Sequence, residues 1–357
     1  MSKMNLKTMK KTTKSNLITY AMVIVIFAVV QILVATGSMS SLMQGLLVPL
    51  CTYSIVAIGL NLCVGYLGEL SLGHAGFMCV GAFSSAFFTR CMENSSMNPT
   101  LRFIIALLIG TAVAAFFGFL IGIPVLRLRG DYLAIVTLAF GEIIKNVINV
   151  LYVGKDENGL HFAINDSKSL NMSGTGEMII DGAKGITGTP RQSTFLIGVI
   201  LILVALFVVF NLVNSRSGRA IMAIRDNRIA AESIGINVTK NKLLAFTISA
   251  AIAGVAGVLY AHNLSMLKVS IFDYNMSITI LVYVILGGMG NLRGSILATI
   301  VLYALPELLR GFSTYRMLIY AIVMITMMLF NWAPAARDFR SRIIEKIKGH
   351  VKEKEAA

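Results

Sequence analysis

The chain has 357 residues, of which 56% are hydrophobic and 13% are charged, and its mean hydropathy is +0.78. This composition excludes a soluble globular domain and indicates a polytopic membrane protein. The formal net charge of +14 does not indicate nucleic-acid binding, because the basic residues lie in the tails and in a few short loops rather than in one patch. We therefore interpret the charge as a signal of orientation in the membrane.

The N-terminal segment, 1–16, is a basic tail that contains five lysines. The apolar run after it is long enough to cross a bilayer, so we interpret it as a spanning helix and not as a cleavable signal peptide. The sequence predicts an all-α fold, a polytopic membrane helical bundle of about ten transmembrane helices. Two stretches, 71–89 and 274–289, are short or polar enough to be re-entrant. The apolar stretches lie near 17–36, 43–66, 71–89, 102–126, 132–153, 193–213, 242–263, 274–289, 294–310 and 316–333.

The distribution of basic residues predicts the orientation of these helices. With the N-terminus inside and successive segments on alternating sides, the cytoplasmic segments hold 21 of the 31 lysines and arginines. Basic loops stay on the cytoplasmic side, so we expect both termini, including a basic tail at 334–357, to be cytoplasmic. The second to fifth and seventh to tenth stretches then form units of opposite orientation, as an inverted repeat requires. Their sequences show little mutual similarity, so the repeat is a hypothesis drawn from topology.

Glycine is unusually frequent in one membrane segment, GYLGELSLGHAGFMCVGAF at 65–83. Small residues let helices approach closely, and glycine also permits local unwinding that exposes backbone groups to a cavity. One interpretation is a tight turn at Gly65–Gly68 followed by a packing seam at Gly73 and Gly76. The other is a polar route through the membrane, or a gate, lined by Glu69, Ser71, Gly73 and His74.

Charged residues inside the membrane must be paired or hydrated. Glu142 and Lys145 are three residues apart on one predicted helix, so we expect them to form an ion pair. Asp131 and Glu307 are further charges in or near the spans. The cysteines show no CxxC spacing and there are only four histidines, which predicts structural thiols and no metal site. The cysteines are Cys51, Cys63, Cys79 and Cys91.

The segment 154–192 is the one long stretch with soluble character, rich in Gly, Ser, Asn and Asp. Within it, Met178-Ile179-Ile180 could form a small hairpin. Loops of this length are either functional or disordered. We favour an outer cap that meets a delivery protein over a plain connector.

The segment 214–241 is the most strongly charged interior part of the chain, and it is basic. A helical wheel from Gly218 to Ile234 places Arg225, Arg228 and Glu232 on one stripe, and Gly235 then offers a C-terminal stop. The opposite side of the wheel holds Ala223, Ile224, Ala230 and Ile234. An amphipathic helix at the inner face could dock on a partner, whereas a solvated loop would only set the topology.

Four blocks of sequence carry a specific resemblance: GLNLCVGYLGELSLGHAGFMCVGAF (59–83), LRLRGDYLAIVTLAFGEIIKNV (126–147), the segment 217–262 and ILGGMGNLRGS (285–295). In order and spacing they resemble the LivM-type permeases of branched-chain amino-acid ABC importers, over about 45–335. The resemblance implies a transmembrane permease domain at 17–333 in a bacterial inner membrane, surrounded by lipid. It also implies a LivH-type permease partner, two ATP-binding subunits and a periplasmic or lipid-anchored substrate-binding protein.

The same resemblance assigns roles to the basic loop. DNRIAAESIGIN at 226–237 is similar to the family's ATPase-docking loop, although no proline follows it here. The implied ATPase-coupling residues are Arg225, Asp226, Arg228, Ala230, Ala231, Glu232 and Gly235. The outer segment DGAKGITGTP at 181–190 resembles a glycine-rich region of the family but lacks its glycine doublet.

The chain contains no GxxxxGK[ST] phosphate-binding loop, so we expect no cofactor in this chain, no catalytic residue, and ATP bound by partner subunits. The expected function is a permease subunit that works by alternating access. A stand-alone ion-coupled secondary transporter is the main alternative, and a membrane enzyme is a weaker one, because His74 and His262 form no recognisable site. The sequence does not define which amino acid or amide is carried.

Overall fold

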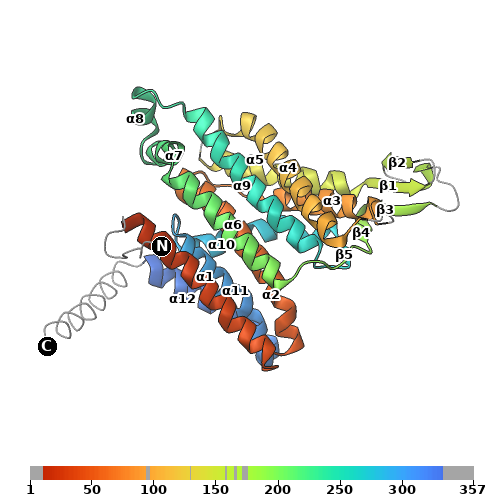
Figure 1. Cartoon of the computed structure of the whole chain (residues 1–357). Coiled ribbons are helices and arrows are strands. Elements are labelled where there is room, and N and C mark those ends of the chain that lie inside the picture. The colour runs from red at the N-terminus through yellow and green to blue at the C-terminus, as the bar shows by residue number, and fades with distance from the viewer. Residues whose placement is uncertain are drawn as a thin grey trace, which may run out of the picture. The chain divides into compact units, whose positions relative to one another are not determined.

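The structure of the protein is a computed structural model, and it describes residues 11–93, 97–128, 130–156, 159–164, 167–170 and 176–332. Most of the predicted N-terminal tail and all of the predicted C-terminal tail, 334–357, lie outside the described residues. The chain divides into two compact units, Met1–Thr299 and Ile300–Ala357. Figure 1 shows the elements along the chain.

The described residues are mostly helical, which confirms the prediction of a helical membrane protein. Each of the ten predicted stretches coincides with an α-helix. Two further helices, α7 and α8, lie in the predicted basic loop. The α-helices are α1 (Lys11–Ala35), α2 (Ser41–Asn61), α3 (His74–Cys91), α4 (Pro99–Val125), α5 (Asp131–Asn149), α6 (Phe195–Asn214), α7 (Arg216–Asp226), α8 (Arg228–Ser233), α9 (Val238–Ala261), α10 (Tyr274–Gly287), α11 (Leu292–Leu308) and α12 (Arg316–Trp332).

Six helical spans in the described part of the chain are long and apolar enough to cross a membrane. Four of the ten predicted stretches, those of α3, α5, α10 and α12, are not among the six, and α3 and α10 are the two that the sequence marked as weak. Helix α10 has 14 residues, which at about 1.5 Å per residue is shorter than a hydrocarbon core of about 30 Å. The six spans are 16–35, 41–67, 99–125, 195–214, 238–261 and 292–311.

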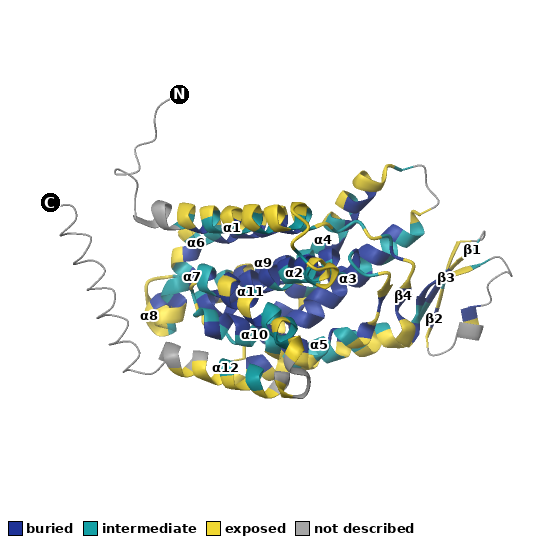
Figure 2. Ribbon diagram, turned by 90° about the horizontal axis from the view of Figure 1, so that it is seen from below, coloured by how far each residue is buried: buried dark blue, intermediate teal, exposed yellow. Residues whose placement is uncertain are grey.

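Helix α9 is the centre of the first unit and packs against α2, α3 and α4. Most residues of α2, α3 and α9 are dark blue in Figure 2, because their side chains are buried on several faces. Glycine permits this density: a Cβ atom at Gly81 of α3 would lie 2.6 Å from the Cα atom of Gly254 of α9. A Cβ atom at Gly257 would overlap the carbonyl oxygen of Met78. The packing seam that the sequence predicted at Gly76 lies against α5, where a Cβ atom at Gly76 would lie 2.7 Å from the Cα atom of Gly141, and it is confirmed there.

The expectation of a purely α-helical fold is wrong for the outer loop. Strands β1 (Leu151–Asp156) and β2 (Gly159–Ile164) form an antiparallel hairpin, and β3 (Glu177–Asp181) pairs with the other edge of β1. The β-structure therefore begins at 151, earlier than the predicted start of the loop at 154. Met178-Ile179-Ile180 forms part of β3 and not a hairpin of its own, and β1 is the central strand of this sheet.

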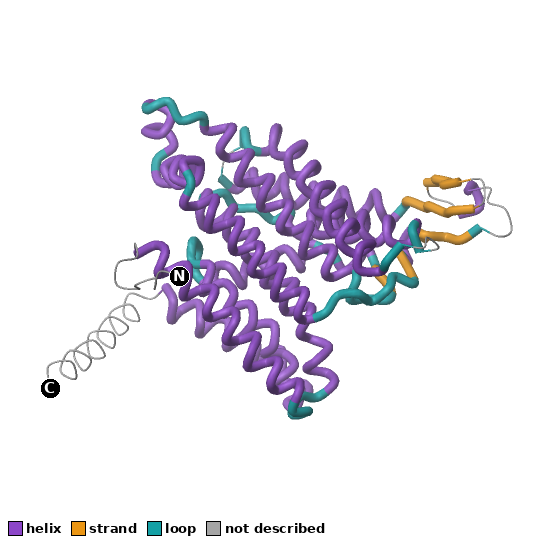
Figure 3. Tube along the Cα trace, in the orientation of Figure 1, coloured by secondary structure: helices purple, strands orange, loops and turns teal. Residues whose placement is uncertain are grey.

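A second, two-stranded sheet connects this loop to the chain that follows α9. Strand β4 (Ile186–Thr187) pairs with β5 (Met266–Leu267) in antiparallel register. All strands lie at one end of the first unit, as the orange segments of Figure 3 show. Short 3-10 helices at Ser167–Leu170, Gly182–Lys184 and Val269–Ile271 complete the connections in this unit.

The second unit comprises the end of α11, a 3-10 helix at Leu309–Tyr315, and α12. Glu307 forms an ion pair with Arg310, whose Nη1 atom lies 2.9 Å from Glu307 Oε1, so this predicted intramembrane acid has a partner. One face of α12 is apolar and exposed. It consists of Leu318, Ile322, Ile325 and Leu329, which recur at helical spacing.

Candidate functional site

Helix α2 does not continue into α3 but ends in a break. A π-helix at Leu62–Leu67 follows α2, and residues 68–73 have no regular secondary structure. Gly68 has a left-handed φ of 79° and ends the π-helix, which a residue with a Cβ atom rarely tolerates. Isolated π-helical turns inside membrane helices occur frequently at functional sites. The 65–73 segment, from Gly65 to Gly73, is therefore the first candidate site.

Contacts with the turn between α10 and α11 fix the start of this segment. The side chain of Asn61 accepts a hydrogen bond from the amide of Gly290 at 2.7 Å and donates one to Ser295 Oγ at 2.6 Å. Gly65 packs directly on the backbone of Gly290, so that a Cβ atom at Gly65 would overlap it. The two glycine-rich breaks that the sequence showed separately thus lie against each other.

Glu69 forms an ion pair with Lys242, which lies in the first turns of α9. The Glu69 side chain is 13% exposed and the Lys242 side chain is 5% exposed. A buried carboxylate needs a partner of opposite charge, because desolvation otherwise disfavours its ionised form. The sequence placed Lys242 among the basic residues of the inner loop, and only the fold shows that it neutralises Glu69.

Ser71 and His74 belong to one chain of hydrogen bonds that ends on α2. His74 Nδ1 is 3.3 Å from Ser71 Oγ, and His74 Nε2 is 2.7 Å from Ser249 Oγ of α9. Ser249 in turn donates its hydroxyl proton to the carbonyl oxygen of Gly59. Ser249 must therefore accept from His74, so a neutral imidazole with its proton on Nε2 satisfies the whole chain.

The rest of the segment is held by α5 and α10. The amide of Leu72 donates to Thr137 Oγ1 at 3.0 Å, and a Cβ atom at Gly73 would lie 2.5 Å from the Thr137 carbonyl oxygen. The amide of Ala75 donates to Ser277 Oγ of α10 at 3.1 Å. The 65–73 segment thus contacts α9, α5 and the turn between α10 and α11, and the first turn of α3 is bonded to α10. Whether Glu69, Ser71, Gly73 and His74 line a route or a gate stays a prediction.

The second candidate site is the pair of short helices α7 and α8. The predicted single helix from Gly218 to Ile234 is wrong, because the backbone breaks at Asn227, which has φ −155° and ψ 105°. The side chain of Asn227 accepts from the amide of Ala230 at 3.0 Å and caps α8. Asparagine favours such a cap over a position inside a helix, because its side chain competes for backbone hydrogen bonds.

The break changes which residues face outwards. Ala231 of α8 is buried and packs with Ile224 of α7 and Val238 of α9. Ile229 and Ile234 are instead exposed, by 80% and 75%, so Ile234 and the buried Ile224, which the wheel placed on one side, do not share a face. Large apolar side chains exposed to this degree, beside charged residues, are typical of protein-binding surfaces.

The remaining predicted coupling residues surround these isoleucines. Arg228 and Glu232 form an ion pair at 3.2 Å across one turn of α8, and Ala230 is exposed. Gly235 has a left-handed φ of 83°, which confirms the predicted stop after α8. We define the α8 face by the exposed residues Ile229, Ala230, Glu232 and Ile234 together with the half-buried Arg228.

Arg225 does not belong to the α8 face. Its Nη1 atom donates to the carbonyl oxygen of Gly65 at 3.0 Å, and its Nε and Nη2 atoms donate to Asp226 Oδ1 at 3.0 and 2.9 Å. The predicted stripe of Arg225, Arg228 and Glu232 is therefore divided between two helices. The structure brings the two candidate sites together through Arg225, which the sequence had grouped with the docking residues.

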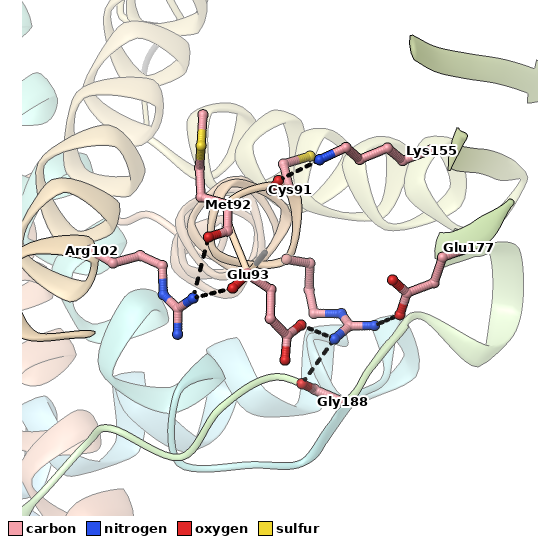
Figure 4. A network of polar contacts seen from close by, with 8 residues as sticks. Cys91, Met92, Glu93, Arg102, Lys155, Glu177 and Gly188 are labelled. Carbon is pink, nitrogen blue, oxygen red and sulfur yellow. Dashed lines mark hydrogen bonds and ion pairs between the residues drawn. The ribbon is translucent and has the colours of Figure 1, made fainter. Parts of the chain in front are cut away.

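At the other end of α3, a polar network holds the three-stranded sheet. Arg90 forms ion pairs with Glu93 and Glu177 and donates to the Gly188 carbonyl oxygen at 3.5 Å. Lys155 of β1 donates to the Cys91 carbonyl oxygen at 2.8 Å (Figure 4). Basic side chains near a helix C-terminus satisfy its last carbonyl groups. A basic residue in the last turn of α3 was the sequence signal for this network, and it was missed.

The buried histidines of the described segments are engaged in hydrogen bonds. His262 Nδ1 donates to the Val258 carbonyl oxygen at 2.9 Å, and His262 Nε2 lies 3.0 Å from Thr89 Oγ1. Within the described residues, no group of three or more His, Cys, Asp or Glu side chains is arranged to hold a metal ion. The predicted pair of Glu142 and Lys145 is confirmed, with Nζ and Oε2 2.5 Å apart.

Comparison with known proteins places this architecture in a family. Residues 42–330 match the family described as branched-chain amino acid transport system / permease component, a range that includes both candidate sites. The high-affinity branched-chain amino acid transport system permease proteins LivM of Salmonella typhimurium and Escherichia coli are each 37% identical over 293 residues. These alignments cover 79% of this chain and 66% of each relative, so the match spans slightly less than two thirds of those proteins.

A more distant relative is the permease protein LivH of Salmonella typhimurium, which is 22% identical over 256 residues, covering 70% of this chain and 79% of the relative. No solved structure matches the chain significantly. The family match covers nearly all described helices, from α2 to α12. The chain therefore belongs to the family of permease components of branched-chain amino acid transport systems.

Proposed function

We propose that this chain is the LivM-type permease subunit of an ATP-driven, binding-protein-dependent importer of branched-chain amino acids. Family membership supports this proposal, and the α8 face is the structural observation on which it rests. A short helix that is anchored by buried Ala231 and presents Ile229 and Ile234 to solvent suits a groove on a separate protein. An importer driven by ATP needs such a contact, because this chain has no phosphate-binding loop of its own.

The partners follow from the same proposal. Similarity to proteins named LivM and LivH supports a pathway built by two related permeases, this chain and a LivH-type subunit. Two ATPase subunits would bind at the α7–α8 end, which we assign to the cytoplasm together with both termini. A substrate-binding protein would meet the sheet of β1, β2 and β3 at the opposite end. The three-stranded sheet is suited to this role because the Arg90 network fixes it to α3.

An inverted repeat of α2–α5 and α9–α12 is part of the proposal. In the first unit the two central helices are α2 and α9. Helix α3, which follows α2, packs on α9, and helix α10, which follows α9, packs on α2. A pseudo-two-fold axis between α2 and α9 would produce this exchange. The repeat also supports about ten crossings in total, with α3 and α10 as short or partial ones.

The mechanism would be alternating access. Closure of the ATPases moves the α8 face, and the rigid helices behind it reorient so that the pathway opens to the other side. Glu69, Ser71 and Gly73 lie on the non-helical connection between α2 and α3, and His74 is the first residue of α3. We assign these four residues to a gate or hinge of this pathway.

The test is to purify the chain from its native membrane in mild detergent and to identify the proteins that accompany it. We expect a stoichiometric ATPase and a second, related permease. In parallel, Ile229→Asp should weaken ATPase association by about thirtyfold, since a central interface residue contributes about 2 kcal/mol or more. The matched control is Ile164→Asp on β2, which is also exposed, by 69%, and should leave ATPase association unchanged.

Two results would contradict this proposal. If the chain is purified alone and catalyses uptake into vesicles without ATP, it is a secondary transporter. If Ile229→Asp and Ile164→Asp retain the ATPase equally well, the α8 face is not the docking surface.

A further inference from the structure

We propose that Arg225 is a positioning residue that transmits the movement of α7 to the 65–73 segment, and that it acts inside the permease rather than in docking. This inference rests on the proposed function, because it assumes that α7 and α8 move when ATP is used. It separates two roles that the sequence had assigned to one stripe. The α8 face holds the ATPase, and Arg225 connects that contact to the break between α2 and α3.

The bond between Arg225 and Gly65 has a clear physical cause. Gly65 lies in the last turn of the π-helix, and residues 68–73 are not helical. The last carbonyl groups of a helix lack partners within the helix, and a cation near them is favourable. Arg225 Nη1 donates to the Gly65 carbonyl oxygen at 3.0 Å, so the guanidinium supplies the donor that the break has removed.

The stem of Arg225 also requires the left-handed glycine next to it. A Cβ atom at Gly68 would lie 2.6 Å from Arg225 Cγ. Gly68 therefore serves two purposes: it turns the chain with φ 79°, and it leaves room for the arginine to reach Gly65. A side chain at this position would displace Arg225 even if the backbone kept its course.

Two sets of contacts restrain Arg225, one at its backbone in α7 and one at its guanidinium. The buried side chains of Ile221 and Ile224 seat α7 against the bundle, with Ile221 in the same cluster as Leu67 of the π-helix. Asp226 accepts from both Nε and Nη2 of the guanidinium. A planar guanidinium braced in this way transmits displacement better than a flexible lysine ammonium would.

The 65–73 segment then passes the displacement to several helices. Four residues after Gly65, Glu69 pairs with Lys242 of α9. Two residues later, Ser71 begins the chain through His74 to Ser249. A shift of Gly65 therefore reaches α9 at two points, and it reaches α5 through the bond between Leu72 and Thr137. Packed elements of this kind have discrete arrangements and do not deform continuously.

The experiment uses the complete importer in proteoliposomes and compares Arg225→Met with Arg219→Met. Methionine preserves much of the arginine stem and removes the guanidinium. Arg219 lies on the same helix, but its Nη1 atom donates to the Asn214 carbonyl oxygen at the helix start. For Arg225→Met we expect unchanged ATPase association and about tenfold lower uptake per ATP hydrolysed, the effect of one charge-assisted hydrogen bond. Arg219→Met should match the wild type in both measurements.

A second measurement reports directly on the segment. In a background without the four native cysteines, Leu70→Cys provides a partly exposed site for thiol labelling in the 65–73 segment, and its labelling rate is compared with and without ATP. We expect ATP to change the rate when Arg225 is present, and we expect the change to be lost in Leu70→Cys/Arg225→Met while the ATPase stays bound. The variant Gly68→Ala should uncouple transport as Arg225→Met does, and the double variant Gly68→Ala/Arg225→Met should be no worse than either alone.

The outcomes distinguish this inference from the proposed function. Loss of ATPase association in Arg225→Met, as in Ile229→Asp, would make Arg225 a docking residue and overturn the inference. Normal uptake per ATP in Arg225→Met would also overturn it and would leave the importer assignment intact. If the wild-type chain neither binds an ATPase nor uses ATP for uptake, the proposed function itself fails.

Discussion

Glu69 and Lys242 form a buried ion pair between the non-helical connection after α2 and the beginning of α9. The two residues are 173 positions apart in sequence, so the pair joins the two central helices of the first unit at the α7–α8 end. Each charge compensates the other in an environment where either one alone would be unfavourable. The pair therefore contributes to holding a specific arrangement of α2 and α9 more than to overall stability.

The first prediction concerns this pair. Lys242→Met leaves the Glu69 carboxylate buried without its partner, and we expect the free energy of unfolding in detergent to fall by about 3 kcal/mol. The double variant Glu69→Gln/Lys242→Met should recover most of this loss, because both charges are then absent. Chemical unfolding of the purified chain measures both values. A double variant that is less stable than Lys242→Met would show that the pair is not the cause.

The second prediction tests the contact between α3 and α9. Gly257→Ala would place a methyl group on the Met78 carbonyl oxygen, and we expect a loss of about 3 kcal/mol in stability or a failure to fold. The control is Gly45→Ala in α2, where nothing lies within 4 Å of the added Cβ atom. Gly45→Ala should be neutral or stabilising by up to about 1 kcal/mol. Equal stability of the two variants would refute close α3–α9 packing.

The third prediction concerns the cap of α8. Asn227→Ala removes the side chain that accepts from the Ala230 amide, which costs about 1 kcal/mol of local stability. Hydrogen exchange of the α8 amides should therefore accelerate about fivefold, and ATPase association should weaken with it. Asn241→Ala is the control, because this side chain donates to the Asn237 carbonyl oxygen at the start of α9 and makes no bond to α8. Unchanged exchange in α8 would mean that α8 is held only by its buried side chains.

The fourth prediction concerns the anchoring of the three-stranded sheet. Arg90→Met removes the ion pairs with Glu93 and Glu177, and we expect faster hydrogen exchange in β3 and about 1 kcal/mol lower local stability, since both carboxylates are partly exposed. Exchange in α7 and α8 should not change.

The control for Arg90 is Lys184→Met. The hydrogen bond with Asp181 raises the pKa of Lys184 above its ordinary value, so the lysine is charged throughout the assay. The pair is exposed to solvent, however, and its loss should not alter exchange in β3. Similar effects of Arg90→Met and Lys184→Met would show that the network around Arg90 has no special role.

The positions of the membrane helices could be predicted from sequence, because long apolar runs have few other solutions in a bilayer. The strands at 151–164 could not, because the hairpin begins inside an apolar run that also suits the end of a helix. The break at Asn227 was missed for a different reason. A helical wheel describes side-chain periodicity, and the capping preference of a single asparagine overrides it locally.

The candidate site was only partly visible in the sequence. Glu69, Ser71 and His74 were identified from their polarity in a membrane segment, but their partners Lys242 and Ser249 lie on a helix more than 170 positions away. The contact of Arg225 with Gly65 could not be predicted, because the partner is a backbone carbonyl group. Side-chain patterns in a sequence carry no information about contacts with a backbone atom of a distant segment.

The pairing of β4 with β5 has a consequence for communication across the membrane. Besides that pairing, the amides of Gln192 and Ser193 donate to the His262 carbonyl oxygen. The loop between α5 and α6 is therefore bonded to the C-terminal end of α9. Lys242 fixes the N-terminal end to Glu69. Helix α9 has 24 residues and is about 36 Å long. Because it is attached at both ends, a displacement of one end moves the other end with it. In the proposed importer, binding of the substrate-binding protein on one side and ATP hydrolysis by the ATPase subunits on the other would then both act on α9.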